Sequence, residues 1–168
     1  MRGRPVTIED VAVRDCWGDG LYVGASKHGE SHDVTIRRCT STGNRRQGLS
    51  ITAGVGAEVV DSAFRDTRGI APESGIDLEP NAPWIVRDVT IRNCVATGNA
   101  GWGILLVGDT VSSCQVEQSQ SLSNGVGGGI ALLRGPSDCV LRDNTVEANA
   151  GPGLHLVGAS SVVVRGNV

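Results

Sequence analysis

The sequence has few aromatic residues and few prolines, and it has no excess of positive charge. Its 168 residues include three Trp, one Tyr, one Phe and six Pro. A core with so few rings must be filled by aliphatic and small residues, which suits narrow repetitive packing better than one bulky core. Lys and Arg total 15 against 18 Asp and Glu, which gives a net charge of −3. Because no basic surplus is present to neutralise a phosphate backbone, nucleic acid is not an expected partner.

Long apolar segments and cysteine motifs are also absent. No apolar run approaches the roughly 18 residues of a membrane span, and Glu9 and Asp10 lie where a secretory signal needs its apolar region. We therefore expect no membrane partner and no signal peptide in this chain. The five cysteines cannot all pair and form no C-x-x-C motif, so buried free thiols are expected, with neither a disulfide framework nor a zinc site.

Glycine, in contrast, is abundant, with 24 residues, and it marks a repeat. Six segments contain a glycine, an aliphatic residue, a variable residue and a second aliphatic residue. They begin at Gly20, Gly48, Gly75, Gly103, Gly129 and Gly153, so the spacings are 28, 27, 28, 26 and 24 residues. A second alternating element lies upstream, as in the segments 34–36 (VTI) and 89–91 (VTI). Both elements have the period of two that is typical of short β-strands, and no stretch has the period of a helix.

The repeat predicts an all-β, parallel β-helix solenoid in which each repeat forms one coil, with about six complete coils and a partial seventh. Successive coils would stack about 4.8 Å apart. Two continuous aliphatic stacks should face inward: Leu21, Leu49, Ile76, Ile104, Ile130 and Leu154, and Val23, Ile51, Leu78, Leu106, Leu132 and Leu156. A third inward column contains polar residues, among them Ser62, Ser119 and Asn144, which need hydrogen-bond partners.

The repeat is clearest in the segments 33–39 (DVTIRRC), 87–94 (RDVTIRNC) and 75–81 (GIDLEPN). These segments resemble the right-handed parallel β-helix repeats of the pectin-lyase-like superfamily, and the resemblance spans essentially the whole chain. Similar domains belong largely to proteins that cleave, epimerise or bind polysaccharides, including pectate lyases, polygalacturonases, alginate epimerases and phage tailspikes. The resemblance therefore implies a polysaccharide partner and an extracellular or cell-surface location for the full-length protein.

Residues 1–168 are interpreted as a single β-helix domain. A β-helix exposes its apolar core and its unpaired strand edges at each end unless it is capped. Here a strand is predicted to begin at Val6, and Val168 falls midway through the seventh coil. We therefore expect a fragment of a longer solenoid that lacks its caps.

Functional groups are expected on the outward face of the repeat strand, where the core makes no demand. The position between the two inward stacks reads Tyr22, Ser50, Asp77, Leu105, Ala131 and His155, and the next outward position reads Gly24, Thr52, Glu79, Val107, Leu133 and Val157. Polar groups thus gather on coils one to three. Long loops at 25–33 and 80–86 flank this face and would form the walls of a groove for an extended polymer.

Nine residues are predicted to form the site. The predicted catalytic residues are Asp77, Glu79, Arg45 and Arg46, and the predicted substrate-binding residues are Asp19, Tyr22, Trp17, Gln47 and Asn81. The two acids are separated by about 6.6 Å along the strand. This suits glycoside hydrolysis, in which one carboxyl protonates the leaving oxygen while the other activates water.

The same residues suit β-elimination on a uronic acid, in which carboxylates hold Ca²⁺ and Arg45 or Arg46 neutralises charge or takes the proton. Calcium is expected only for such a lyase, and no other metal site is predicted. The alternative to an enzyme is a non-catalytic carbohydrate-binding or surface-structural solenoid, such as a tailspike or adhesin segment. In that case Asp77 and Glu79 would be solvated acids on an exposed strand.

The outward face of the later coils is apolar. Leu105, Val107 and Leu133 point outward on adjacent coils. Because a contiguous apolar patch usually marks a contact surface, we expect self-association through these residues.

Overall fold

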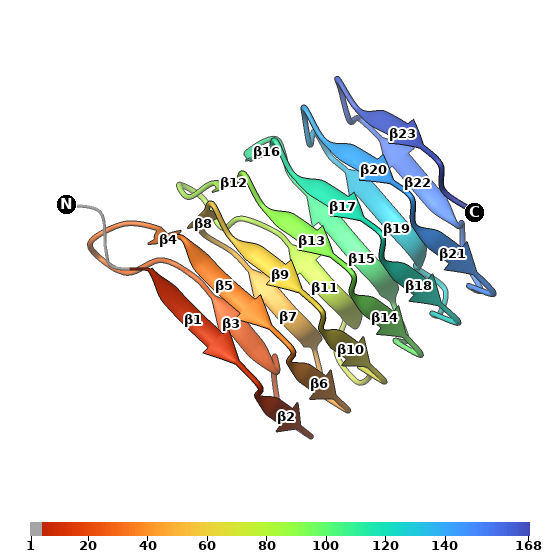
Figure 1. Ribbon diagram of the computed structural model, residues 1–168, viewed down its shortest axis with the longest axis horizontal. Coiled ribbons are helices and arrows are strands. Elements are labelled where there is room, and N and C mark those ends of the chain that lie inside the picture. The colour runs from red at the N-terminus through yellow and green to blue at the C-terminus, as the bar shows by residue number, and fades with distance from the viewer. Residues whose placement is uncertain (1–4) are drawn as a thin grey trace.

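The computed structural model describes residues 5–168, and every regular element in this range is a β-strand. No helix within the described range is long and apolar enough to span a membrane. The strands stack in parallel sheets along one axis, with the N-terminal coil at one end and the C-terminal coil at the other (Figure 1). This arrangement is the all-β solenoid that the repeat predicts.

The first two sheets carry the alternating element that lies upstream of each repeat glycine. The first sheet is seven-stranded and contains β1 (Val6–Glu9), β5 (Val34–Arg37), β9 (Glu58–Val60), β13 (Thr90–Arg92), β17 (Gln115–Glu117), β20 (Val140–Arg142) and β23 (Val163–Arg165). The second is six-stranded and contains β2 (Ala12–Arg14), β6 (Thr40–Thr42), β10 (Ala63–Arg65), β14 (Val95–Thr97), β18 (Gln120–Leu122) and β21 (Thr145–Glu147).

The third sheet carries the repeat glycines and their aliphatic neighbours. It contains β3 (Leu21–Val23), β7 (Gln47–Ile51), β11 (Ser74–Leu78), β15 (Trp102–Val107), β19 (Gly128–Leu133) and β22 (Leu154–Val157). A fourth sheet of two-residue strands closes the first four coils: β4 (Ser31–His32), β8 (Gly54–Val55), β12 (Val86–Arg87) and β16 (Val111–Ser112). Each of these four coils therefore contains one strand of each sheet, and β23 begins a seventh coil.

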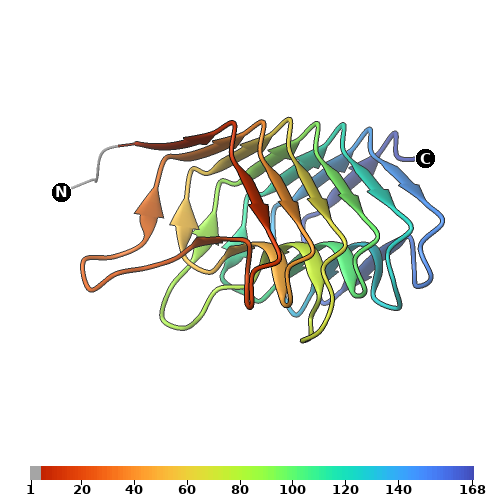
Figure 2. The same ribbon diagram turned by 90° about the horizontal axis from the view of Figure 1, so that it is seen from below.

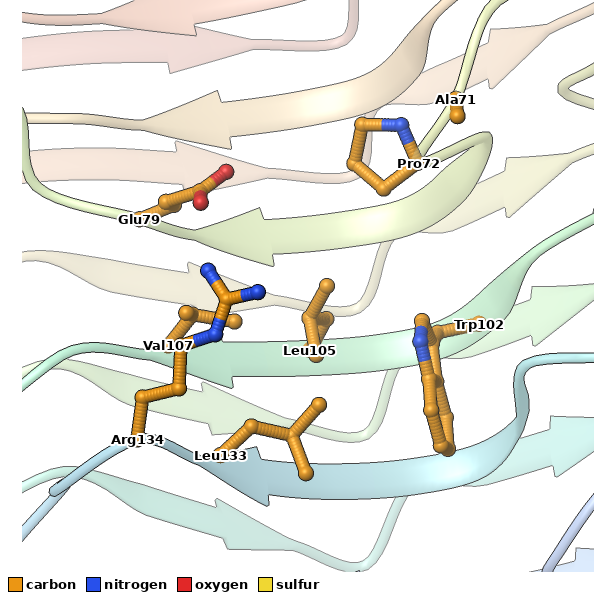
Figure 3. A pocket seen from close by; sticks show the side chains of 8 residues that line it. All are labelled: Ala71, Pro72, Glu79, Trp102, Leu105, Val107, Leu133 and Arg134. Carbon is orange, nitrogen blue, oxygen red and sulfur yellow. The ribbon is translucent and has the colours of Figure 1, made fainter.

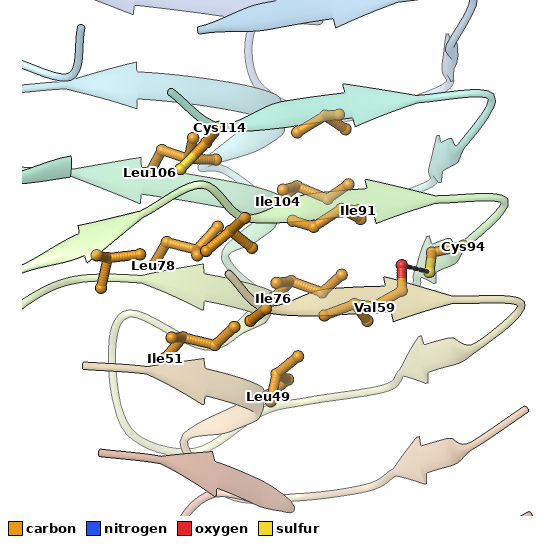
Figure 4. Packing of buried hydrophobic residues seen from close by; sticks show 14 of the residues in the cluster. Leu49, Ile51, Val59, Ile76, Leu78, Ile91, Cys94, Ile104, Leu106 and Cys114 are labelled. Carbon is orange, nitrogen blue, oxygen red and sulfur yellow. Dashed lines mark hydrogen bonds between the residues drawn. The ribbon is translucent and has the colours of Figure 1, made fainter. Parts of the chain in front are cut away.

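The register of the third sheet places equivalent repeat residues directly above one another. Leu49 pairs with Ile76, and Ile76 pairs with Ile104. Their side chains, and those of Ile51, Leu78 and Leu106 in the second stack, point toward the aliphatic residues of the first sheet (Figure 4). The predicted inward stacks are confirmed on coils two to five, where every member is fully buried, whereas Leu156 on coil six is 40% exposed. All five cysteines are free thiols, and four of them lie in the core.

The polar residues of the turns form hydrogen-bonded ladders along the axis. The Ser119 Oγ accepts from the Cys94 backbone N–H at 3.1 Å, and the Asn144 Oδ1 accepts from the Ser119 N–H at 3.0 Å. This confirms that the polar members of the third inward column have partners. A second ladder lies between the second and third sheets, where the Asn124 Oδ1 accepts from both the backbone N–H and the side-chain amide of Asn99.

The contribution of the second ladder to the free energy of unfolding can be tested at Asn99. Asn99 is 1% exposed, accepts from the Thr67 N–H at 3.1 Å and donates to the Phe64 carbonyl at 3.2 Å. Asn99→Ala leaves those buried groups unpaired, so we expect it to lower the free energy of unfolding by about 2–3 kcal/mol. Denaturant titration measures this loss, and Asn81→Ala in an exposed loop is the control that should change nothing. Equal stabilities of the two variants would contradict the stabilising role of the ladder.

Candidate functional site

The outer face of the third sheet carries Tyr22 and Asp77 in the predicted register. Tyr22 pairs with Ser50, Ser50 with Asp77, and Asp77 with Leu105. Three loops project around this face, namely residues 24–30, residues 66–73 and residues 79–85 (Figure 2). The first and third of these loops are the excursions expected from the sequence.

Asp77 faces outward but is buried, so it is not the solvated acid on an exposed strand that the non-catalytic alternative implies. Its exposed fraction is only 2%. The Gln47 Nε2 donates to the Asp77 Oδ2 at 2.6 Å, and the Gln47 Oε1 accepts from the Ser74 backbone N–H at 2.8 Å. Gln47 is thus held at both ends, and it fixes the position of the Asp77 carboxyl.

The Asp77 carboxyl favours its protonated form. Burial is the main cause and the nearby Glu79 carboxyl adds to it, and together they raise the pKa of Asp77 to about 8 despite the opposing charge of Arg46. The Asp77 Oδ1 is buried without a hydrogen-bond partner, and so is the Ser50 Oγ on the neighbouring coil. At neutral pH this site therefore holds a carboxylic acid with one oxygen free of protein partners.

Arg46 and Asp19 form an ion pair beside this acid. The Arg46 Nε lies 2.8 Å from the Asp19 Oδ1, and this hydrogen bond raises the pKa of the Arg46 guanidinium. The Asp77 and Glu79 carboxyl groups raise the pKa of Arg46 further. Arg46 is therefore held as a cation, and its position suits charge neutralisation better than proton abstraction.

The remaining predicted residues occupy the ends of the face. Trp17 is 81% exposed, and the Arg45 guanidinium carbon lies 3.8 Å from the centre of a Trp17 ring. Tyr22 is 59% exposed and accepts a hydrogen bond of 2.7 Å from the Thr52 hydroxyl. Asn81 is exposed in the 79–85 loop. The structure thus gathers Asp19, Arg46, Gln47, Asp77 and Glu79, whereas Arg45 stacks on Trp17.

A pocket of about 350 Å³ lies next to Glu79, over coils three to five. Its floor consists of Leu105, Val107 and Leu133, with Trp102 at one end and Glu79 and Arg134 at the other (Figure 3). Pro72 and Ala71 of the 66–73 loop complete the lining. Of the lining residues, Ala71, Pro72, Trp102 and Arg134 were not predicted from the sequence. Arg134 directly follows the four apolar residues that end its strand (130–133), and this change from apolar to charged is the signal by which it could have been found.

Two of the three residues in the apolar patch of the later coils are buried. Leu105 is 4% exposed and Val107 is 8% exposed, because they pack with Ala131 under Trp102 and Leu133. Self-association through Leu105, Val107 and Leu133 stays a prediction, although the first two of these residues are already buried within the chain. These side chains form a small second hydrophobic cluster within the chain itself.

The carboxyl groups of the face do not fit a calcium site. Calcium takes about six to eight oxygen ligands, usually from several ionised carboxylates. Within residues 5–168 no three or more His, Cys, Asp or Glu side chains come together as candidate metal ligands. Asp77 is largely protonated at neutral pH, and Asp19 is paired with Arg46. These two carboxyl groups are therefore poor ligands for a calcium ion.

The continuous parallel strands, the inward aliphatic stacks and the turn ladders define a parallel β-helix protein. The whole chain, residues 1–168, matches the family described as "Right handed beta helix region", and it belongs to this family. The match confirms the resemblance in the repeat segments and the right-handed course of the coils.

Two proteins of Bacillus subtilis (strain 168) are similar in sequence. The chain is 32% identical over 126 residues to "Uncharacterized protein YclG", covering 62% of this chain and 22% of that protein. It is 35% identical over 86 residues to "SPbeta prophage-derived uncharacterized protein YorA", covering 44% of this chain and 14% of that protein. The matched region thus spans about a fifth or less of the length of these curated relatives.

Two solved structures are similar in shape. Pectate lyase Pel9A superposes with a TM-score of 0.55 and 16% identity, covering 94% of this chain and 51% of that chain. The tailspike protein gp49 from Acinetobacter baumannii bacteriophage Fri1, a capsular polysaccharide depolymerase, gives a TM-score of 0.48 and 16% identity, covering 88% of this chain and 31% of that chain. At this identity the likeness to Pel9A concerns the fold.

Proposed function

We propose that this protein binds a polysaccharide along the outer face of the third sheet and hydrolyses it, with Asp77 as the general acid and Glu79 as its partner carboxyl. The observation that carries the proposal is the buried Asp77 carboxyl, whose Oδ1 has no hydrogen-bond partner and whose pKa is raised by burial. Packing of the core does not require an acid on the outer face. Buried acids with raised pKa are typical of active sites.

The two carboxyl groups divide the roles of a glycosidase between them. Asp77 holds a proton at neutral pH and can donate it to the leaving glycosidic oxygen. Glu79 is half-buried at the rim of the pocket and lies two residues further along the chain. It would activate water or attack the sugar, and the separation of the two carboxyl groups would decide between inversion and retention.

Hydrolysis is better supported than β-elimination. An eliminating enzyme needs a base that removes a proton from the uronic acid, and Arg45 and Arg46 are the candidates for this step. Arg46 is bound to Asp19, which raises the pKa of its guanidinium, and Arg45 stacks on Trp17. The chain shares its fold with a pectate lyase, which makes polysaccharide a sensible ligand class but does not select the reaction.

Non-catalytic glycan binding is the second candidate, and the hydrogen bond from Gln47 to the Asp77 carboxyl favours it. A carboxyl that is 2% exposed and bonded to Gln47 contributes to structure unless a bound glycan reaches its free oxygen. In that case the exposed Tyr22 and the polar rim of the face would bind sugar without cleaving it.

Turnover of a polysaccharide panel, followed by new reducing ends and by the absorbance of unsaturated uronates, tests both candidates. We expect reducing ends without unsaturated products, and Asp77→Asn or Glu79→Gln should lower kcat by about 10²–10⁴-fold. The control is Asp88→Asn, a side chain with 54% exposure near Arg87. Unchanged turnover in Asp77→Asn would overturn its catalytic role, and binding without turnover by the unmodified chain would establish the second candidate.

A further inference from the structure

The pocket over coils three to five shares Glu79 with the proposed acid pair, and the acid pair uses none of its other lining residues. Its floor is aliphatic, formed by Leu105, Val107 and Leu133. Its volume of about 350 Å³ lies at the small end of ligand pockets, which run from about 300 to 1,000 Å³. The pocket therefore suits one sugar unit, or one substituent of it, and not a length of polymer.

Trp102 forms one end of the pocket, and its position depends on glycine in the next coil. The Trp102 ring extends along the axis to His155, with the ring centroids 5.6 Å apart. A Cβ atom at Gly127 would lie 2.9 Å from the Trp102 Cδ1 and 2.8 Å from the backbone of Gly101 and Trp102. The glycine leaves room for the indole, which provides an apolar wall against which a pyranose ring can pack.

The other end of the pocket carries a donor and an acceptor on separate coils. Glu79 follows β11, and Arg134 follows β19 and extends its guanidinium past Val107 (Figure 3). Neither side chain forms an ion pair with another described residue within 4.0 Å. A carboxyl that accepts and a guanidinium that donates thus remain available beside an aliphatic floor.

We propose that this pocket binds the acetamido group of an N-acetylated amino sugar. The methyl group packs on Leu105, Val107 and Leu133, the amide N–H donates to Glu79, and the carbonyl oxygen accepts from Arg134. This inference rests on the proposed function for the class of ligand, a glycan, and it adds the identity of one sugar unit.

Other common sugar units match the pocket less well. The carboxylate of a uronic acid would pair with Arg134 but would be repelled by Glu79 and would lie against an apolar floor. An unsubstituted hexose would place hydroxyl groups on Leu105 and Leu133 without partners, which costs free energy. The acetamido group has one apolar end, one donor and one acceptor, and it satisfies all three features of the site.

Binding measurements on the Asp77→Asn chain test the proposal without requiring turnover. The probes are the methyl glycosides of N-acetylglucosamine and N-acetylgalactosamine, with methyl glucoside, methyl galactoside and methyl galacturonide as comparisons, titrated by NMR. We expect at least one acetamido probe to bind about tenfold or more tightly than its parent hexose, the scale of one apolar group in a fitted pocket. Equal affinity for acetamido sugars and hexoses, or tighter binding of the galacturonide, would overturn the proposal.

Substitution of Arg134 at the end of the pocket tests whether the acetamido group binds in this pocket. Arg134→Gln should weaken acetamido binding by about tenfold and leave hexose binding unchanged, whereas the matched control Arg65→Gln on the second sheet should change neither. Equal effects of the two arginine variants would exclude this pocket. Cleavage of other glycans without acetamido preference would leave the proposed hydrolysis standing and remove this inference. Acetamido binding by a wild-type chain that cleaves no glycan would support this inference and remove the proposed hydrolysis.

Discussion

Leu78→Asp is expected to prevent folding of the chain. Leu78 lies between the outward Asp77 and Glu79, but its side chain points inward and is fully buried between Ile51 and Leu106. The substitution places an unpaired charge inside a continuous aliphatic stack, which costs several kcal/mol. That cost is comparable with the whole stability of a typical domain, about 5–15 kcal/mol. Circular dichroism and the soluble yield after expression measure the result.

Leu133→Asp is the control for this experiment. It makes the same chemical change on the outward face of the third sheet, where Leu133 is half-buried at the pocket. The charge can reach water there, so the variant should fold with a modest loss of stability. A soluble, cooperatively folded Leu78→Asp protein would show that β11 has the opposite orientation, with Leu78 outward and Asp77 inward.

The sequence was sufficient to predict the coils because the strand period is two and the coil period is nearly constant. In β7, β11, β15 and β19 the first and third residues after the repeat glycine are aliphatic and buried, so the register could be assigned from the repeat glycines. The polar turn residues were equally informative, because a buried Asn or Ser in a recurring position must bond to the neighbouring coil. The strand register and the partners of the turn residues both follow from the spacing of residues along the chain, and this spacing can be read from the sequence.

Burial of the outer face could not be predicted in the same way. Alternation assigns Asp77 to the outward side, but its 2% exposure depends on neighbouring side chains and on Gln47, one coil away. The pocket depends in addition on the 66–73 loop, which brings Pro72 beside Leu105 and has no repeat pattern. The identity of the outward residues was therefore correct, whereas their environment required the three-dimensional arrangement.

The burial of Asp77 predicts an unusual dependence of stability on pH. The pKa of Asp77 is raised to about 8 in the folded chain, against about 3.9 for an unfolded chain. Between about pH 4 and pH 8 the folded state keeps a proton that the unfolded state has released. The free energy of unfolding should therefore fall as the pH rises through this window, with a limiting slope of about 1.4 kcal/mol per pH unit. Above the folded pKa this contribution should stay constant.

Asp77→Asn should remove this dependence. The amide can still accept from Gln47 through its oxygen, and it carries no ionisable proton, so the variant should become more stable than the wild type at pH 8 by a few kcal/mol. Chemical denaturation at pH 5, 6.5 and 8 measures the difference. Asp88→Asn, at an exposed position, should follow the wild-type curve at each pH. Parallel pH curves for Asp77→Asn and the wild type would show that Asp77 is ionised in the folded chain. The general-acid role would then fail together with the stability prediction, because both depend on the same retained proton.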